Sequence, residues 1–470
     1  MIEKKILNDE YIKLIKPFVK NFDCFLVGGF IRDLYFGDVS HDRDLIVKSE
    51  FAERIAKNIA DNTNSHFIVL DEKNKIYRVV MPDKVNYFDI SAMLEDDLRK
   101  DINRRDLTIN AIVYDINSEK FINYNELPFK DLQNKILRTF DLQNFLDDPL
   151  RMLRVYRFAA KYNFDIDEQI TNFIKNNYKN INKSAKERVN TELLKLFEGK
   201  YAHFALLKMD ETGLLTEIFP VMKEVKTIPP NTHHHLDLFH HLIETVNQIE
   251  KNYNDLDKKS KDLLDNVEFG NFSRRALLKL AGFLHDIGKP DTWSIDEQTG
   301  RHRFIKHDDV GSKKVVPILK ELKFSKKQIS YVQSMIKYHI YPSALVWQET
   351  VGSKARLKFY RKMYPYFVDI IVLAMSDRLS ALGKDVTYEM VIKNLSDLSI
   401  LLQECFDYGE TQAKPKPFLS GKDIMDITKL PQSKELGDIV KKLYQMQLDG
   451  EILTKEDAVS FLTTKKYLEN

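Results

Sequence analysis

The sequence predicts a small mixed α/β head followed by a long, predominantly α-helical remainder. Within the first 140 residues, short apolar runs typical of strands alternate with helical stretches. From about residue 145 onward, apolar residues recur at i, i+3 and i+4, as in LRMLRVYRFAAKY, which is the pattern of amphipathic helices. A chain of 470 residues also exceeds the length at which one hydrophobic core stops growing, so several domains are expected.

The head is expected to open with an amphipathic helix, because charged residues interrupt the apolar ones throughout MIEKKILNDEYIKLIKPF. Six strands are expected after it, at 25–29, 44–47, 66–70, 77–81, 87–91 and 111–115. Polar segments rich in proline at 227–235 and 410–417 then interrupt the helical period. We therefore predict a head over 1–140, a helical neck over 141–226, a helical body over 227–400 and a helical tail over 401–470.

The composition excludes several classes of protein. Hydrophobic residues make up 43% and charged residues 30%, which excludes collagen-like and low-complexity chains. No apolar run approaches the length of a membrane helix, and the N-terminus does not resemble an export signal, so we expect a cytoplasmic protein without a membrane partner. The two cysteines, Cys24 and Cys405, lie too far apart in sequence to suggest a thiolate cluster, and we expect both to be buried. A net charge of +2 neither requires nor excludes a nucleic-acid partner.

The first candidate site lies in CFLVGGFIRDLYFGDVSHDRDLIV. Gly28 and Gly29, at an expected strand-to-helix turn, would let backbone amides approach a phosphate. Asp42 and Asp44 alternate along a strand, so both side chains point to one face and can hold Mg²⁺ against phosphate oxygens, although an isolated pair is more often a turn feature. Asp89 lies in the apolar run YFDIS, where a carboxylate is costly to bury unless a partner such as a metal satisfies it.

Together with RRDLTINAIVYD, DDPLRMLRVYRFAA, SAKERVNTELLKL and FLSGKDIM, these motifs resemble class II tRNA nucleotidyltransferases, the CCA-adding enzymes of the DNA polymerase beta superfamily. The resemblance covers nearly the whole chain. It implies a polymerase beta-like head in which Asp42 and Asp44 bind the catalytic Mg²⁺ ions and Asp89 is a third catalytic carboxylate. It also implies that the triphosphate or sugar contacts Gly28, Gly29, Arg32, Asp33, Arg104, Arg105, Asp106 and Asn110.

The segment DDPLRMLRVYRF suggests how a base is chosen. Asp148 before Pro149 suits a helix start, and Arg151 follows one turn later. A carboxylate and a guanidinium side by side match the amino donor and ring-nitrogen acceptor of cytosine or adenine and reject uracil or guanine. The resemblance implies this template role for Asp148 and Arg151; the family pattern is EDxxR, and here the first position is Asp147. Arg154 and Arg157 continue the same face toward the nucleotide, or are paired structurally.

The order of nucleotide addition is left open by the sequence. Complete CCA-adding relatives carry a longer loop between the positions of Asp89 and Arg104, and the short segment 90–103 resembles enzymes that add only CC. We expect transfer of CMP, and of AMP, from CTP and ATP to tRNA 3′ ends. The alternatives are a CC-adding enzyme, a poly(A) polymerase, and a phosphohydrolase whose head only binds RNA.

A second pattern of histidines and aspartates spans 233–377, in HHHLDLFHHL, LAGFLHDIGKP, FIKHDDVGS, IKYHIYP and AMSDRLSA. Imidazole and carboxylate ligands suit divalent transition metals, and a buried His285–Asp286 pair would be costly without one. The pattern resembles the HD superfamily of metal-dependent phosphohydrolases, some of which are fused to nucleotidyltransferases and act as phosphatases or cyclic phosphodiesterases. The resemblance implies as ligands His241, with His240 as the alternative, and His285, Asp286, His307, His339 and Asp377.

Clustered lysines in the neck and body suggest a surface for RNA phosphates, although lysine runs are more often simply solvated. The clusters are Lys175, Lys179, Lys183 and Lys186, and Lys313, Lys314, Lys326 and Lys327. The resemblance implies that the neck and the tail over 401–470 bind the tRNA. The expected partners are thus tRNA, CTP and ATP, with recognition of RNA by shape rather than by base sequence. The sequence does not indicate the oligomeric state.

Overall fold

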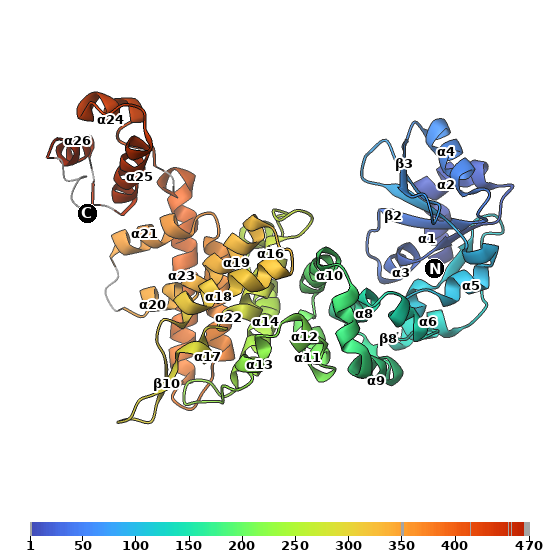
Figure 1. Ribbon diagram of the computed structural model, residues 1–470, viewed down its shortest axis with the longest axis horizontal. Coiled ribbons are helices and arrows are strands. Elements are labelled where there is room, and N and C mark those ends of the chain that lie inside the picture. The colour runs from blue at the N-terminus through green and yellow to red at the C-terminus, as the bar shows by residue number, and fades with distance from the viewer. Residues whose placement is uncertain (1, 349–351, 414, 450, 453, 465–470) are drawn as a thin grey trace. The chain divides into compact units, whose positions relative to one another are not determined.

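The computed structural model describes residues 2–348, 352–413, 415–449, 451–452 and 454–464 (Figure 1). It divides into two compact units, Met1–Phe219 and Pro220–Asn470. The first contains the α/β head and the helices that follow it, and the described residues of the second form helices and one hairpin. Part of the predicted tail, including its last six residues 465–470, lies outside the described residues.

The head is built on a seven-stranded sheet in the order β3-β4-β5-β2-β1-β6-β7. Strands β2 and β5 are parallel, and the other neighbours are antiparallel. The strands are β1 (Cys24–Val27), β2 (Asp42–Val47), β3 (His66–Asp71), β4 (Ile76–Val80), β5 (Tyr87–Ala92), β6 (Val113–Asp115) and β7 (Lys120–Ile122). All six expected strands are confirmed. The short edge strand β7 was not predicted, because three residues are too few to show alternation.

Helices α3 (Gly29–Phe36) and α4 (Ala52–Thr63) pack on one face of this sheet. The other face carries Val27, Ile46 and Val113, which form a core with residues of α5 (Leu98–Asn103). Helix α5 covers only part of that face. The polar ends of β2 and β5 therefore remain uncovered and can form a functional site. The predicted N-terminal helix is interrupted: α1 (Ile2–Asn8) ends before Asp9, whose side chain caps α2 (Glu10–Val19) by accepting from the Ile12 amide at 2.9 Å.

The rest of the first unit is helical, as predicted, apart from a short parallel pair, β8 (Ile136–Leu137) and β9 (Asp165–Ile166). Helix α8 (Leu150–Tyr162) buries its apolar stripe against α10 (Lys186–Glu198) and α11 (Ala202–Glu211). The remaining elements are η1 (Leu94–Asp96), η2 (Thr108–Asn110), α6 (Leu127–Asn134), α7 (Gln143–Asp147), α9 (Glu168–Asn177), η3 (Tyr178–Lys183) and α12 (Leu214–Ile218).

The second unit is centred on α14 (Leu238–Asp255), α16 (Arg274–Leu284), α19 (Lys326–Tyr338) and α22 (Phe367–Ser380), which pack on one another. A hairpin of β10 (Trp293–Ile295) and β11 (His302–Phe304) was not predicted. The other helices are α13 (Met222–Val225), α15 (Lys258–Leu264), α17 (Lys289–Thr292), α18 (His307–Glu321), α20 (Tyr341–Val346), α21 (Ser353–Met363) and α23 (Tyr388–Ala413). The expected break at 227–235 is present between α13 and α14, and α23 ends within the break expected at 410–417.

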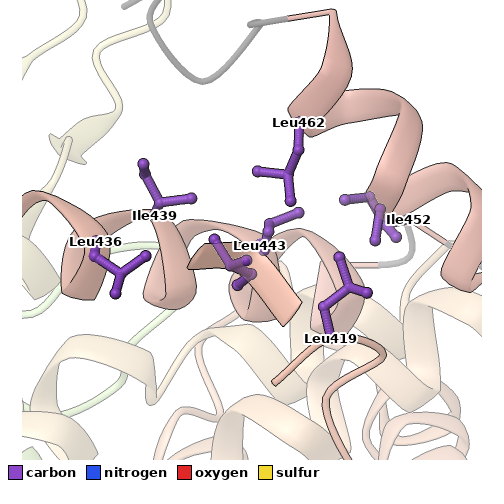
Figure 2. Packing of buried hydrophobic residues seen from close by; sticks show 8 residues of the cluster. Leu419, Leu436, Ile439, Leu443, Ile452 and Leu462 are labelled. Carbon is purple, nitrogen blue, oxygen red and sulfur yellow. The ribbon is translucent and has the colours of Figure 1, made fainter. Parts of the chain in front are cut away.

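The C-terminal helices α24 (Gly421–Thr428), α25 (Lys434–Asp449) and α26 (Lys455–Thr463) share a small hydrophobic core. Figure 2 shows Leu443 of α25 facing Leu419 and Leu462, with Ile452 beside them. Both cysteines are buried and unbridged, as expected. Among the described helices, none is long and apolar enough to cross a membrane.

Candidate active site and candidate metal centre

Three carboxylates converge on the face of the sheet that α5 leaves partly open. Asp42 and Asp44 alternate along β2, and the parallel pairing of β2 with β5 places Asp89 directly opposite Asp44. One oxygen from each of the three carboxylates lies within 4.8 Å of the others. The strand register therefore gathers the three predicted residues into one cluster of oxygen ligands.

The cluster is electrostatically suited to a cation. Burial, and then the neighbouring charges of Asp44 and Asp89, raise the pKa of Asp42 to about 7. Burial likewise raises the pKa of Asp44, although Arg105 opposes this shift. Asp42 Oδ1 is buried and has no hydrogen-bond partner among the described residues. Crowded carboxylates with an unsatisfied oxygen fit a divalent cation, which would relieve their repulsion.

Asp89 is paired with an arginine of the neighbouring strand. Arg78, opposite it on β4, donates from Nε to Oδ1 and from Nη2 to Oδ2, both at 2.7 Å. The Arg78 guanidinium also lies 4.0 Å from the centre of the Tyr87 ring. A protein cation thus supplies a partner for the Asp89 carboxylate, and a role for Asp89 as a metal ligand stays a prediction. Arg78 could have been found only by pairing β4 with β5, which the sequence does not reveal.

Gly28 fits this site closely. It caps α3 with a φ of 80°, a left-handed conformation that favours glycine, and a Cβ atom here would lie 2.5 Å from Asp44 Oδ2. The glycine therefore lets the carboxylate of Asp44 lie against the start of α3. Gly29 is the first residue of that helix, as expected for the strand-to-helix turn.

Arg32 and Asp33 lie together but are occupied by neighbours. Arg32 is only 7% exposed; its Nε donates to the hydroxyl of Tyr162 at 2.9 Å, and its Nη1 donates to Asn110. Asp33 accepts from Tyr162 at 2.6 Å and from Lys161 at 3.2 Å. In this structure the pair joins α3 to α8, and a direct contact with a triphosphate stays a prediction.

Arg104 and Arg105 share one buried anchor that the sequence analysis missed. Asp101, which is 1% exposed, accepts from Arg104 Nη2 at 2.7 Å and from Arg105 Nη2 at 3.4 Å. The i, i+3 and i, i+4 spacing in RKDINRRD was a visible signal of this pairing. Asp101 holds both guanidinium groups at the end of α5, beside the carboxylate cluster.

A neighbouring ion pair links the head to α8. Asp106 accepts from Arg154 Nε at 2.7 Å and from Asn110 Nδ2 at 2.9 Å. Burial alone would raise the pKa of Asp106, but Arg154 and Asn110 outweigh it and hold the pKa below its ordinary value. Arg157 instead pairs with Glu192 of α10 at 3.2 Å.

The residues predicted to choose the base line one cavity of about 270 Å³. Its walls are Asp101, Arg104, Arg105, Asp106, Asp148, Arg151 and Arg154. Asp148 and Arg151 line this cavity together, as expected, and each bonds to another neighbour: Asp148 pairs with Arg188 at 2.8 Å, while Arg151 Nη1 donates to the carbonyl oxygen of Arg104 at 2.7 Å. Helix α8 begins at Leu150, whose amide lies 3.3 Å from Asp148 Oδ1, so Asp148 also supports the helix start.

In the second unit, four histidines present their Nε2 atoms to one centre. The Nδ1 atoms of His285, His307 and His339 lie 2.8, 2.7 and 2.6 Å from the carbonyl oxygens of Gly282, Phe304 and Ile336. His241 Nδ1 lies 3.1 Å from Ser380 Oγ. A histidine fixed at one ring nitrogen with the other facing inward is the usual arrangement of a metal ligand.

Asp286 lies between two pairs of these histidines. Its Oδ2 is 3.4 Å from His241 Nε2 and 3.2 Å from His285 Nε2, and its Oδ1 is 3.1 Å from His307 Nε2 and 3.6 Å from His339 Nε2. Asp377 completes the first group, 3.2 Å from His241 Nε2. The six predicted residues are therefore brought together in two groups of donors that share one carboxylate, which fits two divalent cations.

Further features refine this centre. His240 is exposed and pairs with Asp237 at 2.7 Å, so His241 is the histidine that faces the site. Lys289, which was not singled out, lies 2.5 Å from Asp286 Oδ2. The ring centres of His234 and His241 lie 4.7 Å apart. Burial, and after it the charge of Lys289, lowers the pKa of His234 to about 2. Gly288 permits a close backbone contact, because a Cβ there would lie 2.1 Å from the His307 carbonyl oxygen.

Comparisons with known proteins match both units of the chain. Three described families match in order along the chain: "Poly A polymerase head domain" at 24–138, "Probable RNA and SrmB- binding site of polymerase A" at 163–226 and "HD domain" at 238–382. The chain is 27% identical to the A-adding tRNA nucleotidyltransferase of Deinococcus radiodurans, covering 93% of this chain and 94% of that protein. It is 26% identical to the CC-adding tRNA nucleotidyltransferase of Thermus thermophilus, covering 95% and 94%.

The chain belongs to the class II tRNA nucleotidyltransferase family. Its fold is similar to that of the Thermotoga maritima CCA-adding enzyme in complex with tRNA, with a TM-score of 0.58, 17% identity and coverage of 99% and 98% of the two chains. It is also similar to the Bacillus stearothermophilus CCA-adding enzyme in complex with CTP, with a TM-score of 0.59, 17% identity and coverage of 98% and 97%. This nucleotidyltransferase thus has a head, an RNA-binding segment and an HD domain in the order expected.

Proposed function

We propose that this nucleotidyltransferase adds CMP, and then AMP, from CTP and ATP to the 3′ ends of tRNA. The observation that carries the proposal is the carboxylate cluster of Asp42, Asp44 and Asp89 beside an arginine-lined cavity that contains Asp148 and Arg151. The two are adjacent, since Arg105 and Arg154 line the cavity and both lower the pKa of Asp44, against the raising effect of its burial. Chemistry and base choice can therefore act on one nucleotide.

In the proposed reaction, the ribose 3′-oxygen bonds to the α-phosphorus while the bond to the β-phosphate oxygen breaks and pyrophosphate leaves. Mg²⁺ held by Asp42, Asp44 and Asp89 would supply neutralisation of phosphate charge and activation of the hydroxyl. Arg104 and Arg105, held by Asp101, bind the phosphates in a fixed orientation. Asp89 keeps its position through Arg78, whether or not a cation is bound.

Base selection is assigned to Asp148 and Arg151. Asp148 accepts a hydrogen bond from the amino group of cytosine or adenine, and Arg151 donates to the neighbouring ring nitrogen. Uracil and guanine would present an oxygen to the carboxylate and an N–H to the guanidinium, which disfavours both. Arg151 bonds to the Arg104 and Asn144 carbonyl oxygens through Nη1, which leaves the N–H groups of Nη2 and Nε to donate to the base.

The test is addition to a tRNA transcript that lacks its CCA end, followed by sequencing of the 3′ termini. We expect CCA ends with both nucleotides present and CC ends with CTP alone, and Asp42→Asn should abolish both. CC ends with both nucleotides would instead assign CC addition, which the short segment 90–103, folded into η1 and α5, favours. Long tails made from ATP alone would assign poly(A) polymerase activity, and no addition at all would reject the proposal.

We further propose that the HD domain hydrolyses phosphomonoesters or 2′,3′-cyclic phosphodiesters. The support is the set of inward Nε2 atoms around Asp286, which fits two divalent transition metals; bound there, these would supply Lewis-acid activation of water and phosphate. Lys289 lies at the same carboxylate and adds a positive charge for a phosphate oxygen. Metal analysis of the purified protein and assay with 2′,3′-cyclic AMP test this. His285→Ala should remove metal and hydrolysis, while Asp42→Asn should leave both.

We propose that tRNA phosphates contact the exposed lysines of the neck. We also propose that the enzyme acts in the cytoplasm, where its substrate is found. Lys175, Lys179 and Lys183 are exposed along α9 and η3. The body cluster supports this less, because Lys314 pairs with Glu224 and Asp291, and Lys327 pairs with Glu268. Binding of tRNA should weaken steeply between about 50 and 200 mM salt.

A further inference from the structure

The head contains a second cavity, of about 340 Å³, on the same side of the sheet as the carboxylate cluster. Its apolar lining includes Val113 of β6 and Ile122 of β7, which pair directly. Val113 also pairs with Val27 of β1, and Val27 pairs with Asp44 of β2. Directly paired residues project to the same face, so the cavity and Asp44 share a face and lie two strand spacings apart, roughly 10 Å.

This cavity is distinct from the one that contains Asp148. Helix α5 separates the two: Asp101 and Arg104 at its end line the base-selecting cavity, whereas Arg99, Ile102 and Asn103 line the second one. An incoming nucleotide cannot fill both, because its base is held on the Asp148 side. The second cavity lies on the other side of α5, toward the β6–β7 edge of the sheet.

The rim of the cavity carries polar side chains that have no hydrogen-bond partner among the described residues. The side chains of Arg99, Asn103, Asn123 and Tyr124 line the cavity, and none of the four is hydrogen-bonded within the described ranges of the chain. Tyr124 is 52% exposed, and Phe140 forms part of the wall. An aromatic ring suits base stacking, an amide offers a donor beside an acceptor for a base edge, and a guanidinium suits a phosphate.

We propose that this cavity, the head pocket, binds the penultimate nucleotide of the RNA strand that is being extended. This inference rests on the proposed nucleotidyl transfer, whose second substrate is the RNA strand that is extended. The reacting ribose has to lie at the carboxylates, and the incoming nucleotide occupies the Asp148 side. The neighbouring nucleotide of the single-stranded 3′ end then reaches a pocket about 10 Å away, where Tyr124 stacks on its base and Arg99 binds its phosphate.

The binding test uses an acceptor-stem RNA hairpin with 2-aminopurine as its next-to-last nucleotide and no nucleoside triphosphate present. The fluorescence should fall when the full-length protein binds, because the base stacks on Tyr124. Tyr124→Ala should abolish the quenching and weaken RNA binding about tenfold, and Tyr124→Phe should retain both. Tyr388→Ala is the matched control, because Tyr388 is also an exposed tyrosine, 75% exposed, and lies outside the head.

Kinetics of CMP addition separate this role from a site for free nucleotide. Tyr124→Ala should raise the KM for the hairpin about tenfold and leave the KM for CTP unchanged. A higher KM for CTP with an unchanged KM for RNA would overturn the proposal and assign the pocket to a mononucleotide. Quenching that persists in Tyr124→Ala and Asn123→Ala would overturn it as well. Failure of the wild-type protein to add CMP would reject the transfer reaction, whereas the quenching experiment reports on the pocket without catalysis.

Discussion

Arg188 of α10 binds both oxygens of the Asp148 carboxylate. Its Nη2 donates to Oδ2 at 2.8 Å, and its Nη1 donates to Oδ1 at 3.3 Å. A carboxylate oxygen has two lone pairs, and Oδ1 also accepts from the Leu150 amide, so Oδ2 is the oxygen that can accept a further bond from a base. The fork of the guanidinium fixes the plane of the carboxylate, and Arg188 therefore positions the residue that we assign to base selection.

Replacing Arg188 should loosen base choice more than it slows transfer. Arg188→Ala leaves the Asp148 carboxylate free to rotate, and we expect the ratio of kcat/KM for CTP over UTP to fall about tenfold, with a smaller loss of CTP turnover. Arg188→Lys should restore little, because an ammonium lacks the fork. Lys186→Ala, on the same helix, is the control and should keep the ratio. An unchanged ratio in Arg188→Ala would show that Asp148 needs no such support.

Removing the carboxylate itself should abolish discrimination before it abolishes chemistry. Asp148→Ala removes the acceptor for the amino group, so CMP and UMP should be added at similar, reduced rates. Asp147→Ala is the matched control, since Asp147 is an exposed neighbour whose side chain accepts a hydrogen bond from Gln143. Single-turnover incorporation of each nucleotide measures the effect. A preserved preference for CTP in Asp148→Ala would contradict the template role.

The carboxylate cluster should make metal binding and stability depend on pH. Burial and the charges of Asp44 and Asp89 raise the pKa of Asp42 to about 7, so between pH 4 and 7 the folded protein holds a proton that the unfolded chain has lost. In EDTA, the free energy of unfolding should therefore fall as the pH rises through this range, and Mg²⁺ should bind more tightly above pH 7.

Asp42→Asn should remove this dependence. We expect the free energy of unfolding of the variant minus that of the wild type, measured by urea unfolding in EDTA, to be larger at pH 8 than at pH 5. Comparison of the two proteins cancels the contributions of other titrating groups. A stability difference that does not change with pH would show that Asp42 is not crowded by its neighbours.

Asp101 should act on nucleotide affinity through the two arginines that it holds. Asp101→Asn keeps the side-chain volume but loses charge-assisted bonds to Arg104 and Arg105, so the KM for CTP should rise about tenfold with a smaller change in kcat. Asp101→Glu should recover part of the loss. Glu95→Gln, an exposed acid that pairs with Lys100, is the control. Loss of kcat alone, or loss of the folded state in thermal unfolding, would argue against this positioning role.

Adjacent histidines offer a matched pair for the HD centre. His241→Ala removes an inward Nε2, and the metal content of the purified protein should fall by at least half. His240→Ala removes an exposed ring from the next position on α14, and the metal content should stay unchanged. Elemental analysis after dialysis measures both. Equal metal contents in the two variants would contradict the assignment of His241.

Several features of the site follow from the chain alone. Asp42 and Asp44 share a face because alternate residues of any strand do, and Gly28 precedes a helix because the apolar run changes its period there. The histidines at 241, 285, 307 and 339 are recognisable because the motifs that contain them resemble those of the HD superfamily. These inferences depend on spacing within a few residues or on motifs, and both can be read along a sequence.

The tertiary structure decided which charges meet. Arg78 reaches Asp89 through the pairing of β4 with β5, and Arg188 reaches Asp148 because α10 packs on α8. Side chains far apart in sequence become partners only when strands take a register or helices pack, and a charged residue gives no sign of its partner beforehand. The sequence therefore determined the kind of chemistry, whereas packing determined which residues hold the reacting groups in place.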